Sequence, residues 1–164
     1  MFESAAIDTA DKATFYGELA EQVSSMMHGE PDAIANAANL SALLFEQMPD
    51  LNWAGFYFLR SPDELVVGPF QGKVACVRIR VGKGVCGTAV ARKQSILVED
   101  VDAFPGHIAC DSASRSELVV PLIKGDKVIG VLDLDSPNLA RFDAADQAGI
   151  EAIAKIYVEA CGPA

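Results

Sequence analysis

Apolar residues return at helical spacing near both ends of the chain and at strand spacing between them. Over residues 12–27 they recur about every four positions, which predicts a helix capped by Asp11. A second helix is predicted over residues 31–48, because Pro31 suits a first helical turn, with Ile34 and the leucines at 40, 43 and 44 on its inner side. Asp143 is the predicted cap of a closing helix that ends near Cys161.

Between these helices the pattern shortens to the alternation of β-strands. The predicted strands are residues 53–59, 64–70, 74–80, 96–98, 118–124 and 127–135. Residues 88–93 are predicted as a short helical piece, residues 99–116 as a long loop, and Gly125 and Asp126 as the turn of the last hairpin. The elements describe one α+β domain over residues 1–164. It has a helical part at 1–49, a mostly antiparallel sheet of about six strands at 51–140, and a closing helix at 143–161.

Four side chains in the predicted sheet region break its apolar pattern. Structural cysteines normally behave as small buried hydrophobes. Cys76, however, shares a face of its predicted strand with two arginines, whereas Val77 is expected on the apolar face. Cys110 lies in the polar loop. On the last strand Asp133 and Asp135 share one face, with their side chains about 7 Å apart. Two acids on a strand that looks buried are costly unless they have a use.

The sequence leaves the register of the last hairpin open. A two-residue turn at Gly125 and Asp126 pairs Leu118 with Asp133, whereas a three-residue loop at 124–126 pairs Glu117 with Asp133. A shift of one residue exchanges the faces of all the side chains on a strand. Only the second arrangement places Glu117 in one cavity with the two aspartates.

Composition narrows the partners and the compartment. The formal net charge of −10 argues against nucleic acid or an anionic membrane as a partner. The N-terminal residues show no signal-peptide pattern, and no apolar run reaches the ~20 residues of a membrane helix. We therefore expect a cytoplasmic protein. In that reducing compartment, four cysteines indicate redox chemistry or metal binding before structural disulfides.

One set of residues has the composition of a zinc site. His107 and Cys110 have His-x-x-Cys spacing, and Cys76 and Cys86 are the remaining candidate ligands. No Cys-x-x-Cys pair accompanies them, so we expect no metal and no other cofactor. Cys161, on the closing helix, is expected to be structural.

Longer stretches of the sequence resemble a known family. LNWAGFYFL, GKGVCGTAVARKQSILVEDV and SELVVPLIKGDKVIGVLDLDS are similar to a GAF domain across nearly the whole chain. The stretches FQGKVACVRIRVGKGVCGTA and VDAFPGHIACDSASRSELVVPL more specifically resemble the free methionine-(R)-sulfoxide reductases, which are GAF enzymes with three cysteines. The spacings of 10 residues from Cys76 to Cys86 and 24 from Cys86 to Cys110 agree with that pattern.

The resemblance implies roles for individual residues. It makes Cys110 the catalytic cysteine, Cys76 the principal resolving cysteine and Cys86 a secondary one. It places the remaining matched residues around the substrate: Glu117, Asp133 and Asp135 as acids lining the cavity, and Trp53 against the methyl end. It further implies free methionine-(R)-sulfoxide as substrate, a Cys76–Cys110 disulfide in the oxidised enzyme, and thioredoxin as reductant.

The chemistry of sulfoxide reduction needs the groups that this chain supplies. A thiolate attacks the sulfoxide sulfur, the oxygen is protonated, and the resulting sulfenic acid condenses with a second thiol. Carboxyls crowded into one cavity raise one another's pKa, so one can keep a proton for the oxygen. Another carboxyl, left ionised, can hold the ammonium group of a free amino acid. The alternative function is a GAF sensor that binds a small molecule without catalysis. The oligomeric state stays open, a homodimer included.

Overall fold

The computed structural model describes residues 1–162, so the last two residues of the predicted domain lie outside the described part. The helices are α1 (Lys12–Met27), α2 (Ala33–Gln47), α3 (Gly84–Arg92) and α4 (Ala144–Ala160), with a 3-10 turn at Val101–Ala103. The strands are β1 (Trp53–Ser61), β2 (Glu64–Gly72), β3 (Arg78–Arg80), β4 (Ile96–Val98), β5 (Ser116–Lys124) and β6 (Lys127–Ser136). No helix in this part of the chain is long and apolar enough to cross a membrane.

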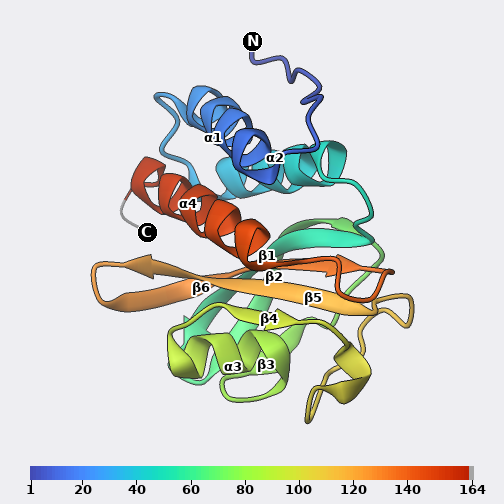
Figure 1. The fold of residues 1–164 in the computed structure, drawn as a ribbon. Coiled ribbons are helices and arrows are strands. Elements are labelled where there is room, and N and C mark those ends of the chain that lie inside the picture. Colours follow the sequence, from blue (N-terminus) through green and yellow to red (C-terminus); the bar gives the residue numbers. More distant parts are fainter. Residues whose placement is uncertain (163–164) are drawn as a thin grey trace.

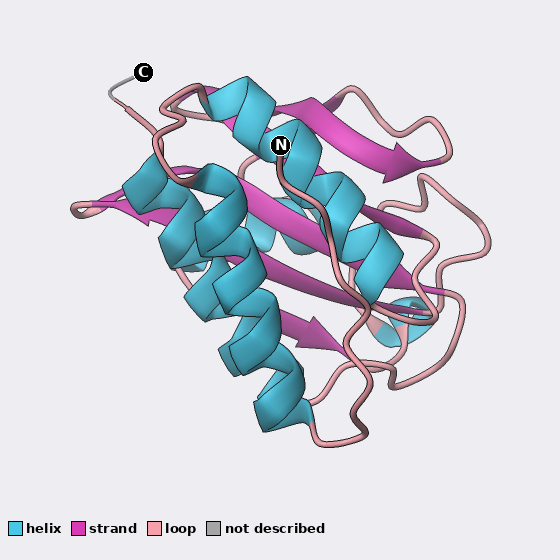
Figure 2. Ribbon diagram, turned by 90° about the horizontal axis from the view of Figure 1, so that it is seen from above, coloured by secondary structure: helices cyan, strands magenta, loops and turns pink. Residues whose placement is uncertain are grey.

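The six strands form one sheet in the order β3-β2-β1-β6-β5-β4, and all neighbours run antiparallel. This confirms the predicted architecture. α1, α2 and α4 cover one face of the sheet, and α3 lies on the other (Figure 1). Figure 2 looks down onto the three-helix layer. β4 pairs with β5 only as far as Val119. Pro121 lies past this point, so the backbone N–H that proline lacks is not missed by β4.

The central strands alternate between two apolar clusters, one on each face. Along β1, Ala54, Phe56 and Phe58 face the three helices, whereas Trp53 and Tyr57 face α3. β5 and β6 alternate in the same way, as the period of two in a strand requires. The helix side is filled by aliphatic and aromatic residues, among them Leu118, Val120, Leu122, Leu132 and Leu134.

The first two helices show how side-chain caps set a helix start. α1 begins where predicted, because the Asp11 side chain accepts from the backbone N–H of Thr14. The prediction that α2 starts at Pro31 is wrong by two residues. Asp32 caps that helix by accepting from two free backbone N–H groups, so the proline lies before the cap. Ile34 was expected to face inward, but its position in the first turn leaves it 51% exposed.

The predicted strand over residues 74–80 is wrong in its first half. β3 contains only its last three residues, and Cys76 lies in the preceding loop, residues 73–77, called here the Cys76 loop. Val77 was expected on the apolar side but is 58% exposed. β3 pairs with β2 only from Arg78 to Arg80, so nothing extends the ladder to Cys76.

α3 begins four residues before the predicted start at Thr88. Glycines suggested a loop there, yet Gly84 and Gly87 belong to the helix. A Cβ on Gly87 would collide with the carbonyl oxygen of Arg80, so the glycine allows close packing rather than chain reversal. Cys86 is consequently a residue of the first turn of α3.

The hairpin of β5 and β6 takes a register that neither alternative predicted. Lys124 pairs with Lys127 across a two-residue turn, but Leu122 pairs with Gly130, so Ile129 is an extra residue in β6. This bulge shifts all later pairs, and Glu117 comes to lie opposite Asp135. Glu117, Asp133 and Asp135 therefore share one face, as the cavity hypothesis requires, although the pairing is different.

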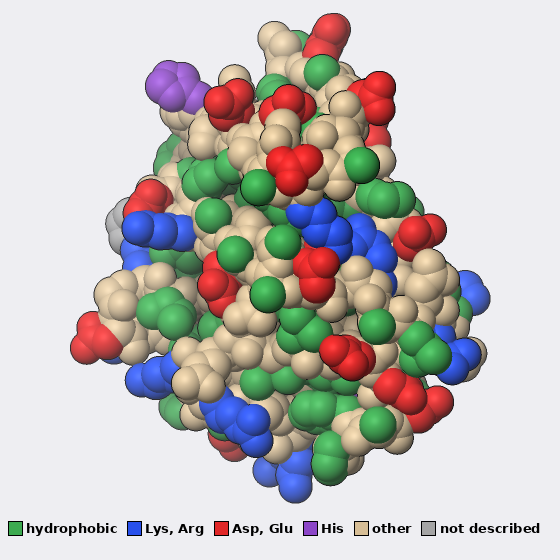
Figure 3. Space-filling model, in the orientation of Figure 1, with side chains coloured by type: hydrophobic (Ala, Val, Ile, Leu, Met, Phe, Trp, Pro, Cys, Tyr) green, Lys and Arg blue, Asp and Glu red, His purple; other side chains and the backbone are tan. Residues whose placement is uncertain are grey.

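Charge is distributed unevenly along this fold. Residues 1–59 contain nine acidic residues and a single basic residue, Lys12. Acidic side chains accordingly dominate the top of Figure 3, over α1 and α2. Residues 65–98, which carry Cys76 and Cys86, contain six Lys and Arg and no Asp or Glu. Cys76 and Cys86 thus lie in the most basic part of an acidic chain, whereas Cys110 lies outside it.

Candidate active site

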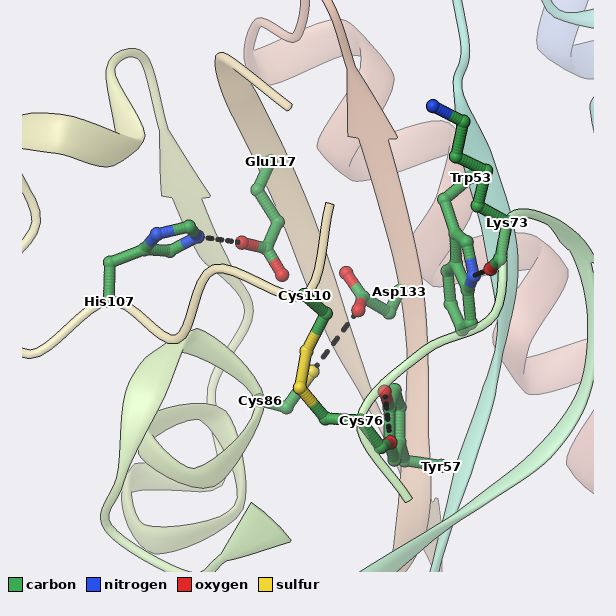
Figure 4. The surroundings of a disulfide bond; sticks show 9 residues. All are labelled: Trp53, Tyr57, Lys73, Cys76, Cys86, His107, Cys110, Glu117 and Asp133. Atoms are coloured by element: carbon green, nitrogen blue, oxygen red, sulfur yellow. Dashed lines mark hydrogen bonds and ion pairs between the residues drawn. A yellow bond between two sulfur atoms is a disulfide. The ribbon is translucent and has the colours of Figure 1, made fainter. Parts of the chain in front are cut away.

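A small cavity lies on the face of the sheet opposite the three-helix layer. It has a volume of about 40 Å³ and is lined from β1, β3, α3, β5 and β6 and from two loops. These are the Cys76 loop and the Cys110 loop, residues 104–115 (Figure 4). Six of the seven predicted site residues line it: Trp53, Cys86, Cys110, Glu117, Asp133 and Asp135.

The seventh, Cys76, is bonded to Cys110. This disulfide joins the two loops, with the Cα atoms 5.5 Å apart, within the usual range. The hydroxyl of Tyr57 donates to the backbone carbonyl of Cys76 at 2.9 Å and ties its loop to β1. The structure therefore represents an oxidised state, in which Cys86 and Cys161 are free thiols.

Cys86 points from the first turn of α3 toward the acids on the sheet. Its Sγ donates to Oδ2 of Asp133 at 3.3 Å (Figure 4). The sulfur and one carboxyl oxygen each from Glu117 and Asp133 lie within 4.8 Å of one another. Glu117 and Asp133 are each only 5% exposed. Two carboxyls and a thiol thus share a space that excludes bulk water.

This crowding favours the protonated forms of all three acids. Burial raises the pKa of Glu117 well above its usual range, and the nearby Asp135 adds to the effect. Burial likewise raises the pKa of Asp133, with Glu117 as the second cause, and the pKa of Asp135, with Asp133 as the second. Burial and Asp133 raise the pKa of the Cys86 thiol. The cluster therefore keeps its protons to a higher pH than exposed carboxyls do.

His107 extends this cluster to the Cys110 loop. Its Nε2 lies 3.5 Å from Oε2 of Glu117. Burial lowers the pKa of His107, although the charge of Asp102 opposes this shift. The lowered pKa of His107 and the raised pKa of Glu117 both favour a neutral imidazole beside a protonated carboxyl.

Aromatic side chains form the apolar wall of the cavity. Trp53 stacks between Tyr57 and Phe70, with ring centroids 5.8 and 5.1 Å away. Its Nε1 donates to the backbone carbonyl of Lys73 at 3.1 Å, so the indole also holds one end of the Cys76 loop. Burial raises the pKa of the Tyr57 phenol, so that hydroxyl remains a donor at neutral pH.

Asn52, directly before β1, fastens the Cys110 loop from the other side. Its Nδ2 donates to Oδ2 of Asp111 at 3.1 Å and to Oγ of Ser114 at 3.0 Å, while its backbone N–H donates to the carbonyl of Asp135. Asp111 directly follows Cys110 in the chain. One amide therefore positions the loop that carries Cys110.

The sequence did not reveal three of these contacts. Tyr57, His107 and Asn52 were not assigned to the substrate site, and His107 was considered only as a zinc ligand. For Tyr57 a signal existed, because it lies four residues after Trp53 on the same strand face. The contacts of Asn52 and His107 depend on the path of an irregular loop and had no local signal. The set suggested by His-x-x-Cys spacing is not assembled, since Cys76 and Cys110 are bonded to each other.

Comparison with known proteins agrees with this geometry. The chain is 55% identical over 140 residues to the free methionine-R-sulfoxide reductase of Escherichia coli (strain K12), covering 85% of this chain and 84% of that protein. It is 44% identical over 140 residues to the Saccharomyces cerevisiae protein of the same name, covering 81% and 78%. The structure of the free methionine-R-sulfoxide reductase from Neisseria meningitidis in complex with its substrate matches with a TM-score of 0.93 at 46% identity, covering 98% of this chain and 95% of that one.

More distant structures share the fold alone. The GAF domain of a phosphoenolpyruvate-protein phosphotransferase from Coxiella burnetii matches with a TM-score of 0.81 at 17% identity, covering 91% of this chain and 94% of that one. The GAF domain family model matches residues 35–160. The chain therefore belongs to the GAF domain family and, within it, to the free methionine-R-sulfoxide reductases.

Proposed function

We propose that this chain reduces free L-methionine (R)-sulfoxide to L-methionine. One observation carries the proposal: Cys110, disulfide-bonded to Cys76, lines the same cavity as three buried carboxyls. A thiol that reaches a second thiol, beside acids that keep their protons, is the set of groups that sulfoxide reduction needs. The names of the bacterial and yeast relatives support the same substrate.

The proposed reaction begins with attack of the Cys110 thiolate on the sulfoxide sulfur. The oxygen passes to Cys110 as methionine leaves, so the sulfoxide is reduced and the thiol is oxidised to a sulfenic acid. The Cys76 thiol then attacks the Cys110 sulfur, forms the disulfide and releases the oxygen as water. A dithiol protein such as thioredoxin reduces the disulfide and restores both thiols.

Glu117 and Asp135 are the proposed proton donors to the sulfoxide oxygen. Their raised pKa directions support this role, because a general acid must still hold its proton at the working pH. We assign Asp133 chiefly to the ammonium group of the substrate, and Trp53 to its methyl end. Peptide-bound methionine has no ammonium group beside its side chain, so this cavity would select the free amino acid.

Cys86 is the proposed secondary resolving thiol. Its hydrogen bond to Asp133 and its complete burial favour the protonated thiol, whereas thiol–disulfide chemistry uses the thiolate. Cys76 lies in a half-exposed loop and is the better placed of the two. This difference supports Cys76 as the principal partner of Cys110.

The surroundings of the disulfide fit a protein reductant. Val74, Val77 and Ile108, each within two residues of a bonded cysteine, are among the exposed large apolar side chains of the molecule. An apolar rim around a reactive disulfide suits docking of a thioredoxin-type protein. Such recycling places the enzyme in the cytoplasm, where thioredoxin keeps thiols reduced.

The decisive test incubates the full chain with methionine (R)-sulfoxide and dithiothreitol and measures free methionine. We expect turnover, with N-acetylated methionine sulfoxide a much poorer substrate. Cys110→Ser should reduce kcat by about 10⁴-fold or more, as loss of a nucleophile does. Cys161→Ser is the matched control, since this cysteine lies on the helix side of the sheet. Ligand binding without turnover in the wild type would instead favour the sensor function.

Peptide mapping tests the resolving thiol. After one equivalent of substrate, the reduced enzyme should contain a Cys76–Cys110 disulfide. A Cys86–Cys110 bond as the sole product would exchange the two resolving roles. Removal of Cys76 should impair thioredoxin-driven turnover more than the first reduction of substrate, because the initial attack does not use that thiol.

A further inference from the structure

Four groups of different chemistry converge on the cavity beside the disulfide. They are the thiol of Cys86, the carboxyls of Asp133 and Glu117, and the imidazole of His107, all in its lining. They come from α3, β6, β5 and the Cys110 loop, so four separate elements hold them in place. In the oxidised state none of them is used by the disulfide.

Two distances within this set match the edges of a metal-centred tetrahedron. Zinc binds sulfur at about 2.3 Å and nitrogen or oxygen at about 2.0–2.2 Å, so adjacent ligand atoms lie roughly 3.3–3.6 Å apart. The Cys86 Sγ to Asp133 Oδ2 distance is 3.3 Å, and the His107 Nε2 to Glu117 Oε2 distance is 3.5 Å. One ligand atom each from Cys86, Glu117 and Asp133 falls within 4.8 Å of the others. His107 lies outside that group of three, so its ring must turn toward Cys86 and Asp133 to supply the fourth ligand.

A second observation points to a cation in the same place. Oδ1 of Asp133 is buried and has no hydrogen-bond partner, although the residue is only 5% exposed. Buried carboxyl oxygens are normally paired. The neighbour of Asp133 here is the Glu117 carboxyl, which can donate to it only while protonated, so a cation can take this oxygen once Glu117 ionises. The cavity of about 40 Å³ exceeds the ~10–15 Å³ that one water needs. An ion with a bound water fits that space, whereas a whole amino acid requires the loops to move.

We propose that Cys86, Asp133, Glu117 and His107 form a binding site for a divalent transition metal ion, zinc above all, and that the bound ion blocks the substrate cavity. A mixed sulfur, nitrogen and oxygen set suits zinc, whereas Ca²⁺ and Mg²⁺ prefer oxygen alone. On binding, the Cys86 thiol proton and the protons of the carboxyls pass to solvent. The ion takes the place of the substrate's ammonium group against Asp133, so zinc and substrate exclude each other.

This ion is an inhibitor, and the proposed reaction needs no metal. The site differs from the set suggested by His-x-x-Cys spacing, because it uses neither Cys76 nor Cys110. Inhibition rests on the proposed function, but metal binding does not, and the two are measured separately.

Binding is tested on the full chain with its disulfide intact, where Cys86 and Cys161 are the free thiols. Cobalt(II) is the probe, because thiolate coordination produces a sulfur-to-metal absorption band and tetrahedral geometry produces strong visible bands. We expect one equivalent of cobalt with both features, and its displacement by zinc. Cys161→Ser should keep both features, whereas Cys86→Ser should lose the sulfur band and bind at least ~10-fold more weakly.

His107→Ala guards against a misfolded Cys86 variant, because His107 lies in a surface loop. It should keep the sulfur band but also weaken binding at least ~10-fold. Absence of cobalt binding, a sulfur band that survives Cys86→Ser, or a band lost in Cys161→Ser would overturn the site. Unchanged affinity in His107→Ala would overturn the four-ligand assignment.

Inhibition is tested with a phosphine reductant, since dithiols chelate zinc. Zinc should raise the KM for methionine (R)-sulfoxide without lowering kcat, and a chelator should reverse the effect. Zinc that binds but leaves KM unchanged would overturn the blocking role while the site itself stands. Absence of turnover in metal-free enzyme would contradict the proposed function and leave the cobalt result unaffected.

Discussion

Both faces of the sheet bury an apolar cluster, but the strands bury acids only on the α3 side. Toward α1, α2 and α4 the central strands present aliphatic and aromatic side chains, such as Leu132 and Leu134. Toward α3 and the loops β6 presents Asp133 and Asp135, directly alternating with those leucines. Burial of apolar surface stabilises the fold by about 25 cal/mol per Å². Burial of a carboxyl opposes folding unless it finds partners.

Two buried aspartates show the difference most clearly. Asp146, in the first turn of α4, accepts from the Tyr16 hydroxyl at 2.7 Å, from Lys12 at 2.6 Å and from Arg141 at 3.5 Å. It also caps its own helix by accepting from the backbone N–H of Asp143. Asp133, in the cavity, accepts from the Cys86 thiol and faces the carboxyl of Glu117 instead of a Lys or Arg. Asp146 is thus neutralised by two basic side chains, whereas Asp133 lacks such a partner, as its proposed role of holding the substrate's ammonium group requires.

The largest expected effect is a fall in kcat that distinguishes Glu117 and Asp135 from Asp133. Glu117→Gln and Asp135→Asn should each lower kcat by about 10²–10⁴-fold, because general-acid assistance is made in the transition state. Asp133→Asn should mainly raise KM and reduce the preference for free over N-acetylated substrate. Steady-state kinetics of the three variants with both substrates measures this. Unchanged kcat in both Glu117→Gln and Asp135→Asn would mean that water supplies the proton.

The same substitution on the helix side should affect stability alone. Asp146→Asn removes the charge that Lys12 and Arg141 share, and a hydrogen bond to a charged group contributes about 1.5–3 kcal/mol. We expect a loss of stability of this size in urea unfolding, with kcat of the folded enzyme unchanged. A large fall in kcat would show that the two faces are coupled rather than independent.

Asp133→Asn should have the opposite sign and stabilise the protein. The pKa of Asp133 is raised in the folded state, so the wild type loses stability as pH rises above the unfolded pKa of about 4. An amide avoids this loss and can still accept from Cys86. The gain should be near zero at pH 4 and grow toward pH 8, by about 1.4 kcal/mol for each pKa unit of the shift. Urea unfolding at both pH values gives the answer, and a gain independent of pH would contradict the ionisation account.

The smallest expected effect concerns the clamp on the Cys110 loop. Asn52→Ala removes two hydrogen bonds, each with a net contribution of about 1 kcal/mol. We expect kcat/KM to fall about fivefold to thirtyfold, and amide hydrogen exchange to accelerate in residues 107–115. Ser114→Ala is the partner for a double-mutant cycle. Additive losses would show that the two side chains act independently, contrary to the observed contact.

What the sequence predicted well was local. Asp11 and Asp143 cap helices through their own neighbours, and the residues of β4 are bounded by turn signals, so all three were located correctly. Cys76 and Gly87 were placed in the wrong elements. The end of β3 depends on its pairing with β2, and Gly87 is required by contact with Arg80. Both depend on other parts of the chain.

The candidate site shows the same division. Its residue types and cysteine spacings could be recognised from the sequence, and the structure gathers these residues around one cavity. The hairpin register could not be recognised, because the bulge at Ile129 depends on contacts with another strand. Gly130 follows the bulge, and a Cβ there would collide with the carbonyl oxygen of Tyr57 on β1. A third strand thus takes part in fixing which side chains of β5 and β6 meet.

That bulge has a consequence for protein engineering. It lies about 17 Å along the strand from Glu117, five residues at about 3.4 Å each. A designer who transfers only the residues near the sulfur atoms to another protein would therefore leave the bulge out. A designer who copied the acids and cysteines onto a regular hairpin would align Glu117 with Leu134 and turn the acid into the apolar layer. The minimal portable unit is therefore the whole β5–β6 hairpin with Ile129 and Gly130, not the cavity lining alone.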